Sequence, residues 1–94
     1  MYYRIDIYIG SDNHSREINE EYLGRVREWA DENFPEGYTL LKGEGCYKGV
    51  YEDSILLNAL TPYDIPNTRL SSLKESLEQE AIIIVKSGVT LETI

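Results

Sequence analysis

The sequence has little of the chemistry that catalysis and metal binding ordinarily need. Its 94 residues contain one cysteine, Cys46, and one histidine, His14. A single cysteine permits no internal disulfide, and one Cys with one His is too small a set for a metal cluster. The longest apolar run, residues 81–85, is far too short to span a bilayer. These absences predict a cytoplasmic protein with no metal, no cofactor and no membrane partner.

Basic residues are also scarce. Nine Lys and Arg stand against seventeen Asp and Glu, which gives a formal net charge of −8. This charge would repel a phosphate backbone, so we expect no nucleic-acid partner. Two interpretations of the acidity stay open: a charge that simply favours solubility, or an acidic surface that engages a basic protein partner. The eight tyrosines suit an interface or a ligand platform, because each combines apolar area with a polar tip.

Hydrophobic periodicity predicts four strands, two helices and a short tail. Alternating apolar residues indicate strands, and apolar residues at helical spacing, preceded by capping residues, indicate the helices. The predicted elements are a strand over 2–9, a helix over 20–34 capped by Asn19, strands over 37–45 and 53–60, a helix capped by Asn67 or Thr68, a buried strand over 81–85, and a short extra strand holding Val89 and Leu91.

This β-α-β-β-α-β order predicts an α+β fold of the ferredoxin-like kind, in a single domain over residues 1–94. Two interleaved halves give a four-stranded antiparallel sheet with both helices on one face and a short C-terminal extension. A chain of this length buries only roughly 60% of its unfolded surface, so oligomerisation is a natural way to enlarge its core. The face of the sheet away from the helices would carry Tyr2, Arg4, Asp6 and Tyr8, which are rather aromatic for a solvated surface.

Residues 37–49 read GYTLLKGEGCYKG, a glycine-rich segment that invites a nucleotide-binding interpretation. The spacing of Gly43, Gly45 and Gly49 misses the dinucleotide fingerprint by one residue, and the next predicted element is a strand, so no helix N-terminus follows to hold a pyrophosphate. Two interpretations stay open. One is a twisted hairpin that needs glycines for bulges or tight turns; the other is an anion-binding tip that uses backbone amides with Lys42 and Lys48.

No arrangement of side chains in the sequence indicates catalysis. Cys46 and His14 lie on different predicted segments, and a lone cysteine in a hairpin is more often a small apolar residue than a nucleophile. Acidic pairs such as Glu52 and Asp53 have no third, orienting residue. We therefore predict that the chain is not an enzyme, and that it has no catalytic residues.

Several short motifs together resemble a small uncharacterised ferredoxin-like family that is distantly similar to the PII-like superfamily of trimeric signalling proteins. The motifs are Tyr8-Ile9-Gly10, Phe34-Pro35-x-Gly37, Tyr38-Thr39-Leu40 and Gly43-x-Gly45-x-Tyr47-x-Gly49. The resemblance covers roughly residues 2 to 86. It implies a homo-oligomer such as a trimer, packed through the open sheet faces, with nucleotides or other small anions bound between subunits. The ligand-responsive connection would be residues 45–52, and Lys86 would be the remaining C-terminal basic residue.

Two functions from different classes follow from these observations. The first is a non-enzymatic, oligomeric protein that binds or sequesters a small anionic, nucleotide-like ligand at subunit interfaces. Its site residues would be Lys42, Tyr47, Lys48, Arg4 and Tyr8, since glycine amides and lysines suit an anion while tyrosines stack on a planar ring. The alternative is an acidic protein-interaction module, such as a virus-encoded inhibitor that covers a basic surface of a host factor. A small hydrolase or isomerase is a distant third.

Overall fold

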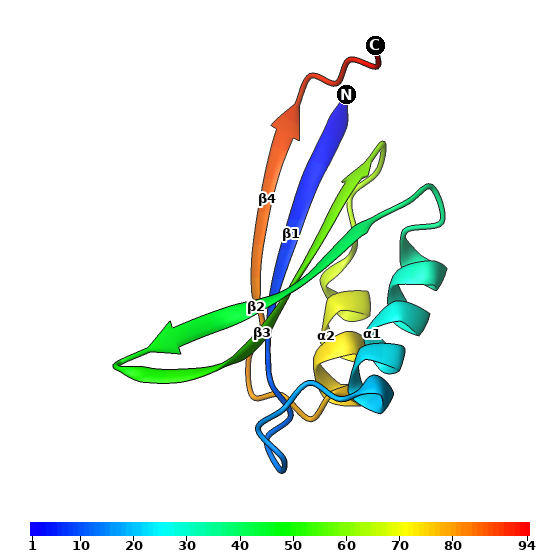
Figure 1. Cartoon of the computed structure of the whole chain (residues 1–94). Helices are drawn as coiled ribbons and strands as arrows, with labels where there is room; N and C mark the ends of the chain where they lie inside the picture. The colour runs from blue at the N-terminus through cyan, green and yellow to red at the C-terminus, as the bar shows by residue number, and fades with distance from the viewer.

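The computed structural model describes all 94 residues as one four-stranded sheet with two helices on one of its faces (Figure 1). The elements are β1 (Tyr2–Gly10), α1 (Glu20–Asn33), β2 (Thr39–Tyr47), β3 (Val50–Thr61), α2 (Asn67–Ser76) and β4 (Ile83–Val89). The strand order is β2-β3-β1-β4, and every neighbouring pair is antiparallel. This arrangement confirms the predicted ferredoxin-like β-α-β-β-α-β fold.

The core lies between the sheet and the helices, and β1 provides its centre. Ile5, Ile7 and Ile9 point toward the helices and are at most 1% exposed. Their partners in the sheet include Ile55 and Leu57 of β3, which are fully buried on the same face. Because side chains alternate across a strand, the residues between them must point to the opposite, helix-free face. We call that opposite face the open face.

The first helix begins and ends as its sequence predicts. The Asn19 side chain accepts a 2.8 Å hydrogen bond from the backbone N–H of Tyr22, which satisfies one of the free donors at the helix start. The helix ends before Phe34, and Pro35 disfavours helical geometry at the residue that precedes it. The indole N–H of Trp29 donates a 3.2 Å hydrogen bond to the carbonyl of Arg69, which ties α1 to α2.

Two predictions about the second half of the chain are wrong. Pro66 occupies the N-cap position of α2, so neither Asn67 nor Thr68 caps this helix; proline has no N–H to leave unpaired, and its fixed φ suits a helix start. The last strand does not stop at Val85. It continues to Val89, because β1 offers hydrogen-bonding partners along its whole length, from Tyr8 opposite Ile83 to Tyr2 opposite Val89.

The prediction that residues 81–85 form a buried strand also needs correction. The strand β4 lies at the edge of the sheet, where Ile83 is 66% exposed and Val85 is 40% exposed. Only Ile82 and Ile84 pack partly against the core. The short apolar run therefore alternates between a half-buried side and the open face. The chain has no helix long and apolar enough to cross a membrane.

Candidate functional site

The hairpin of β2 and β3 extends past the rest of the sheet as a two-stranded ribbon (Figure 1). The pairing of β1 with β3 ends at Gly10 opposite Ser54, whereas β2 and β3 stay paired as far as Tyr47 opposite Val50. The connection is therefore only Lys48 and Gly49, much shorter than the loop over 45–52 that the sequence resemblance implied. We call residues 44–53 the ribbon.

The turn of the ribbon has the left-handed geometry that two-residue hairpins prefer. The φ angle is 51° at Lys48 and 80° at Gly49, the signs of a type I′ turn. Glycine adopts this backbone freely, but a residue with a Cβ does so at a cost. The hairpin interpretation of the glycine-rich segment is therefore correct at Gly49, and no helix follows that could bind a pyrophosphate.

Two adjoining hollows lie beside the ribbon. The inner hollow, of about 400 Å³, lies where the ribbon leaves the sheet; its main lining side chains are Tyr8, Cys46, Tyr47, Glu52, Ser54 and Ile83. The outer hollow, of about 460 Å³, lies between the ribbon and the loop after β1; its polar and charged lining side chains are Ser11, Asp12, Asn13, Arg16, Lys48 and Glu52, with Tyr47 and Tyr51 beside them. Tyr47 and Glu52 line both hollows. Both volumes lie in the range of small-molecule sites.

Glu52 is held at the junction of the hollows by a chain of hydrogen bonds. The buried hydroxyl of Ser11 donates a 2.8 Å hydrogen bond to Oε2 of Glu52. The Gln79 side-chain amide donates to the carbonyl of Ser11 at 2.7 Å and to the hydroxyl of Tyr22 at 3.1 Å. Tyr22 in turn donates a 2.6 Å hydrogen bond to the carbonyl of Gly10. The end of β1 is thus fixed to α1, to the segment after α2 and to the ribbon.

The outer hollow brings together both signs of charge. Asp12 accepts hydrogen bonds from the backbone N–H groups of His14 and Ser15, which hold the pKa of its carboxyl below the usual range. Glu52 is the second carboxylate, and Arg16 and Lys48 are the two cations. The hollow is therefore polar and close to neutral, whereas the inner hollow is largely apolar and aromatic with Glu52 as its one acidic side chain.

The structure brings three of the five predicted site residues to the hollows. Tyr8 lines the inner hollow, Lys48 lines the outer one, and Tyr47 lines both. Lys42 lines neither: it pairs with Ile55 and so shares the helix-facing side of the sheet. Arg4 lies on the open face near the other end of β1, where its Nε is 3.4 Å from a carboxylate oxygen of Asp6.

Three other residues singled out in the sequence do not form a site together. Cys46 lines the inner hollow, but His14 points to Glu78, with 3.8 Å between His14 Nε2 and Glu78 Oε2. Lys86 is engaged by Asp64, whose carboxylate lies 2.9 Å from the lysine Nζ.

Sequence reasoning missed the loop after β1. The sequence alone assigned no role to Ser11, Asp12 or Arg16, and Glu52 was considered only as one of an acidic pair without an orienting residue. The signal was the polar run that directly follows an apolar strand, because strand ends are where a fold can place functional side chains. Ser11 and Glu52, which are hydrogen-bonded to each other, lie 41 positions apart along the chain, and no local sequence pattern predicts that they come into contact.

Comparison with known proteins identifies the fold. No protein-family model matches the chain, and no curated protein sequence does. Two solved structures are similar. A phage SAM lyase in complex with S-methyl-5'-thioadenosine has a TM-score of 0.59 and 14% identity over 92% of this chain and 80% of that one. A DUF3240 family protein from Shewanella baltica has a TM-score of 0.62 and 12% identity over 98% of this chain and 94% of that one.

These similarities correct one prediction and limit another. The prediction that the chain is not an enzyme, drawn from the lack of a catalytic arrangement in the sequence, is contradicted by a lyase of the same small fold. The absence of a familiar catalytic triad therefore does not argue against catalysis here. Identities of 14% and 12% show the shared fold alone. The likeness to PII-like signalling proteins stays a prediction.

Proposed function

We propose that this chain binds a nucleoside-type small molecule in the two hollows beside the ribbon, within a homo-oligomer. The observation that carries the proposal is the junction of an aromatic, apolar hollow with a charged one, with Tyr47 and Glu52 lining both. A nucleoside has the same division, since its base is planar and weakly polar while its ribose and 5' substituent are polar. A nucleotide-like ligand would place its anionic group near Lys48.

The inner hollow suits the base. Tyr8 and Tyr47 offer two aromatic rings, and Ile83 offers an exposed aliphatic surface beside them. Aromatic side chains stack on planar ligands, and apolar walls favour burial of the ring. The backbone of Gly10 and Gly45 forms part of the same wall, so the base can approach the sheet closely.

Glu52 suits the ribose. An ionised carboxylate only accepts hydrogen bonds, and a ribose offers two neighbouring hydroxyl donors. One oxygen of Glu52 already accepts from Ser11, so the carboxylate is oriented before any ligand arrives. An orientation that is fixed in advance lowers the entropic cost of binding.

The ligand of the phage SAM lyase indicates which class of small molecule to test on this chain. It was solved with S-methyl-5'-thioadenosine, a neutral adenine nucleoside with a thioether at its 5' position. We extend this ligand class to the present chain because the two proteins share a fold and because the inner hollow has room and aromatic walls for a base.

A second copy of the chain is the partner we propose for the open face. This face carries exposed apolar side chains on all four strands: Tyr8, Leu41, Leu60, Ile83 and Val85 are 40–66% exposed. The ribbon adds Tyr47, Val50 and Tyr51, and a lone two-stranded ribbon is only marginally stable in water. Packing between copies would cover most of both surfaces and leave the inner hollow as a ligand site between subunits, and a small domain gains most from such burial.

The direct test is a titration of the full chain with S-methyl-5'-thioadenosine, followed by calorimetry and thermal melting. We expect saturable binding and a higher melting temperature, since a ligand at 100 times its Kd adds about 2.7 kcal/mol. Glu52→Gln should weaken binding, while Glu44→Gln, on the same ribbon but outside both hollows, should leave it unchanged. Absence of binding by the unmodified chain would overturn the proposal.

Turnover is tested with the same samples. The chain is incubated with S-adenosylmethionine, and chromatography then measures the appearance of S-methyl-5'-thioadenosine above the rate without protein. The assay is warranted because the phage protein that shares this fold is a SAM lyase.

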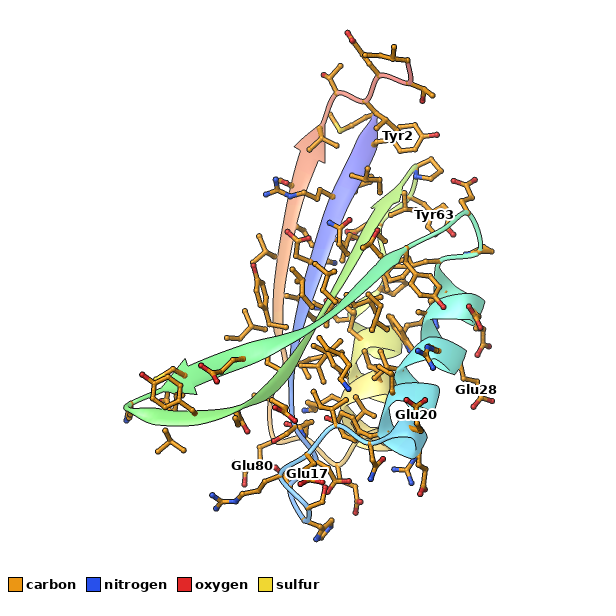
Figure 2. The ribbon with its side chains drawn as sticks, viewed as in Figure 1. Tyr2, Glu17, Glu20, Glu28, Tyr63 and Glu80 are labelled. Carbon is orange, nitrogen blue, oxygen red and sulfur yellow. The ribbon has the colours of Figure 1, made fainter.

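A basic protein partner is a second proposal, supported by the outer surface of α1. This helix carries five acidic and two basic residues, and Glu20 and Glu28 project from it (Figure 2). Such binding would weaken steeply with salt and would survive substitution of Lys42 and Lys48. A partner captured equally well at low and high salt would contradict it.

A further inference from the structure

The outer hollow holds a balanced set of charges in a chain that is strongly acidic. Arg16 and Asp12 line it from the loop after β1, and Lys48 and Glu52 line it from the ribbon. The chain as a whole has seventeen acidic residues against nine basic ones, so basic side chains are in the minority. Two of the nine lie at this one hollow, on segments far apart in the sequence.

These two cations have no acidic partner within ion-pair distance. The ion pairs of the structure are Arg4–Asp6, His14–Glu78, Arg25–Glu21, Arg27–Glu20 and Lys86–Asp64. Lys48 instead has its Nζ 5.3 Å from the centre of the Tyr47 ring. In a chain with a large surplus of carboxylates, Arg16 and Lys48 are therefore available to a ligand.

Both cations belong to residues with a left-handed backbone. Arg16 has a φ of 60° and Lys48 a φ of 51°, a left-handed conformation that side chains other than Gly and Asn adopt at a cost. The Arg16 N–H donates a 2.7 Å hydrogen bond to the carbonyl of Asp12, which closes the loop behind it. Both residues thus emerge from tight, hydrogen-bonded turns at the rim of the outer hollow.

The carboxylates of the hollow are already oriented and keep free acceptor capacity. Asp12 uses one oxygen for the backbone of His14 and Ser15. Glu52 uses one oxygen for Ser11. Each carboxylate has about four lone-pair directions, so both can accept further hydrogen bonds from a cationic donor.

We infer that the outer hollow binds the α-amino-acid head group of an adenosyl amino acid, with the ligand carboxylate toward Arg16 and Lys48 and its ammonium toward Asp12 and Glu52. This inference rests on the proposed function, which places the nucleoside in the inner hollow. A zwitterion matches two cations and two anions. A phosphate group matches less well, because its two negative charges would face the carboxylates of Asp12 and Glu52.

The inference is tested by calorimetry on the full chain with three probes: S-methyl-5'-thioadenosine, S-adenosylhomocysteine and adenosine 5'-monophosphate. The first lacks the amino-acid group, the second carries it, and the third carries a phosphate instead. We expect S-adenosylhomocysteine to bind roughly tenfold more tightly than the other two, because a hydrogen bond to a charged group contributes about that factor.

Two variants locate the effect. Arg16→Asn and Lys48→Asn remove one cation each while keeping a residue that tolerates the left-handed backbone. Each should lower the affinity for S-adenosylhomocysteine to near that for S-methyl-5'-thioadenosine and leave the latter unchanged. Lys42→Asn is the control, since Lys42 is a lysine of β2 outside the ribbon, with no ion pair and no place in either hollow.

The outcomes separate this inference from the proposed function. If S-methyl-5'-thioadenosine binds and S-adenosylhomocysteine binds no more tightly, the head-group subsite is wrong and the nucleoside site stands. If the phosphate probe binds most tightly, the hollow takes an anion and the zwitterion inference is overturned. If none of the probes binds, the proposed function fails and the inference fails with it.

Discussion

The hydroxyl of Ser11 and the carboxylate of Glu52 are 2.8 Å apart, although 41 positions separate them in the chain. Their hydrogen bond joins the end of β1 to the ribbon at the point where the two hollows meet. Ser11 is buried, so its hydroxyl has few other partners, and Glu52 is thereby held in one orientation. The position of the proposed ligand-binding carboxylate thus depends on a residue in a different segment.

Substitution of Ser11 by alanine tests this dependence. We expect a loss of about 1 kcal/mol in the free energy of unfolding, the usual contribution of one hydrogen bond, because the variant lacks the donor to Glu52. Binding of S-methyl-5'-thioadenosine should weaken several-fold as the carboxylate loses its fixed orientation. Urea denaturation and calorimetry measure the two effects. Ser15→Ala, in the same loop but outside the hollows, is the control, and equal effects of the two variants would contradict the prediction.

Gly10 offers a second way to move the same carboxylate. A Cβ added at Gly10 would lie 3.3 Å from Oε1 of Glu52, closer than most real contacts, whereas one added at Gly43 would meet nothing within 4 Å. Because the contact is with the far end of the Glu52 side chain, which can move aside by a few tenths of an ångström, Gly10→Ala should change stability little but displace the carboxylate and weaken ligand binding. Gly43→Ala should leave binding unchanged. Calorimetry on both variants checks this, and normal binding by Gly10→Ala would argue against Glu52 as a ligand contact.

The fold could be predicted because its signals are local. The alternation at Ile5, Ile7 and Ile9 and the Asn19 cap each predict one element within a few residues, and the order of elements then leaves few topologies. The errors arose where the extent of an element depends on a neighbouring strand that is distant in the sequence. The strand β4 continues past Lys86 because β1 provides its hydrogen bonds, and the sequence of residues 86–89 alone does not predict this pairing.

The site was harder to predict because it is assembled from distant segments. Tyr47 and Lys48 were found through the glycine-rich segment, and Tyr8 through the aromatic alternation of β1. Arg16 lies in a polar loop that carries no periodicity, and its approach to Lys48 follows from the ribbon overhanging the end of β1. The overhang depends on the exact position of the turn, which was placed within 45–52 but not at two residues.

The type I′ turn predicts opposite effects of two substitutions. Gly49 has a φ of 80°, so Gly49→Ala should destabilise the protein by about 1–2 kcal/mol, the cost of a left-handed backbone at a residue with a Cβ. Lys48→Asn creates Asn-Gly, the preferred pair for this turn, and should raise stability slightly. Chemical denaturation of both variants measures the change. Equal stability of Gly49→Ala and the parent chain would mean that the turn differs from the one described.

The exposed apolar residues of the open face predict self-association. Leu41 is 55% exposed on this face, so Leu41→Glu should not disturb a monomer, yet it would bury a charge in an interface between copies. We expect sedimentation velocity to show an oligomer for the parent chain and a shift toward monomer for the variant. Ser72→Glu on α2 adds the same charge on the helix side and should have no effect. A parent chain that sediments as a monomer at high concentration would rule out the oligomer.

Tyr22 predicts a loss of stability at alkaline pH. Burial raises the pKa of its hydroxyl from 10.0 to about 12, although the hydrogen bond from Gln79 opposes the shift. Between these values the unfolded chain releases the phenolic proton while the folded chain keeps it. The folded state therefore binds more protons than the unfolded state, and the free energy of unfolding must fall as the pH rises from about 10 to about 12.

The variant Tyr22→Phe isolates this effect. It should be less stable than the parent chain at pH 7, by about 1 kcal/mol, because the carbonyl of Gly10 and the amide of Gln79 lose a partner. Its stability should also fall less steeply above pH 10, since it has no buried phenol to ionise, so the difference between the two proteins should shrink. Tyr38, whose pKa is raised by its hydrogen bond to Asp31, is present in both and cancels. Urea denaturation at several pH values measures both slopes. Tyr51→Phe, at a solvent-exposed tyrosine, is the control, and parallel slopes for Tyr22→Phe and the parent chain would show that Tyr22 does not carry the alkaline transition.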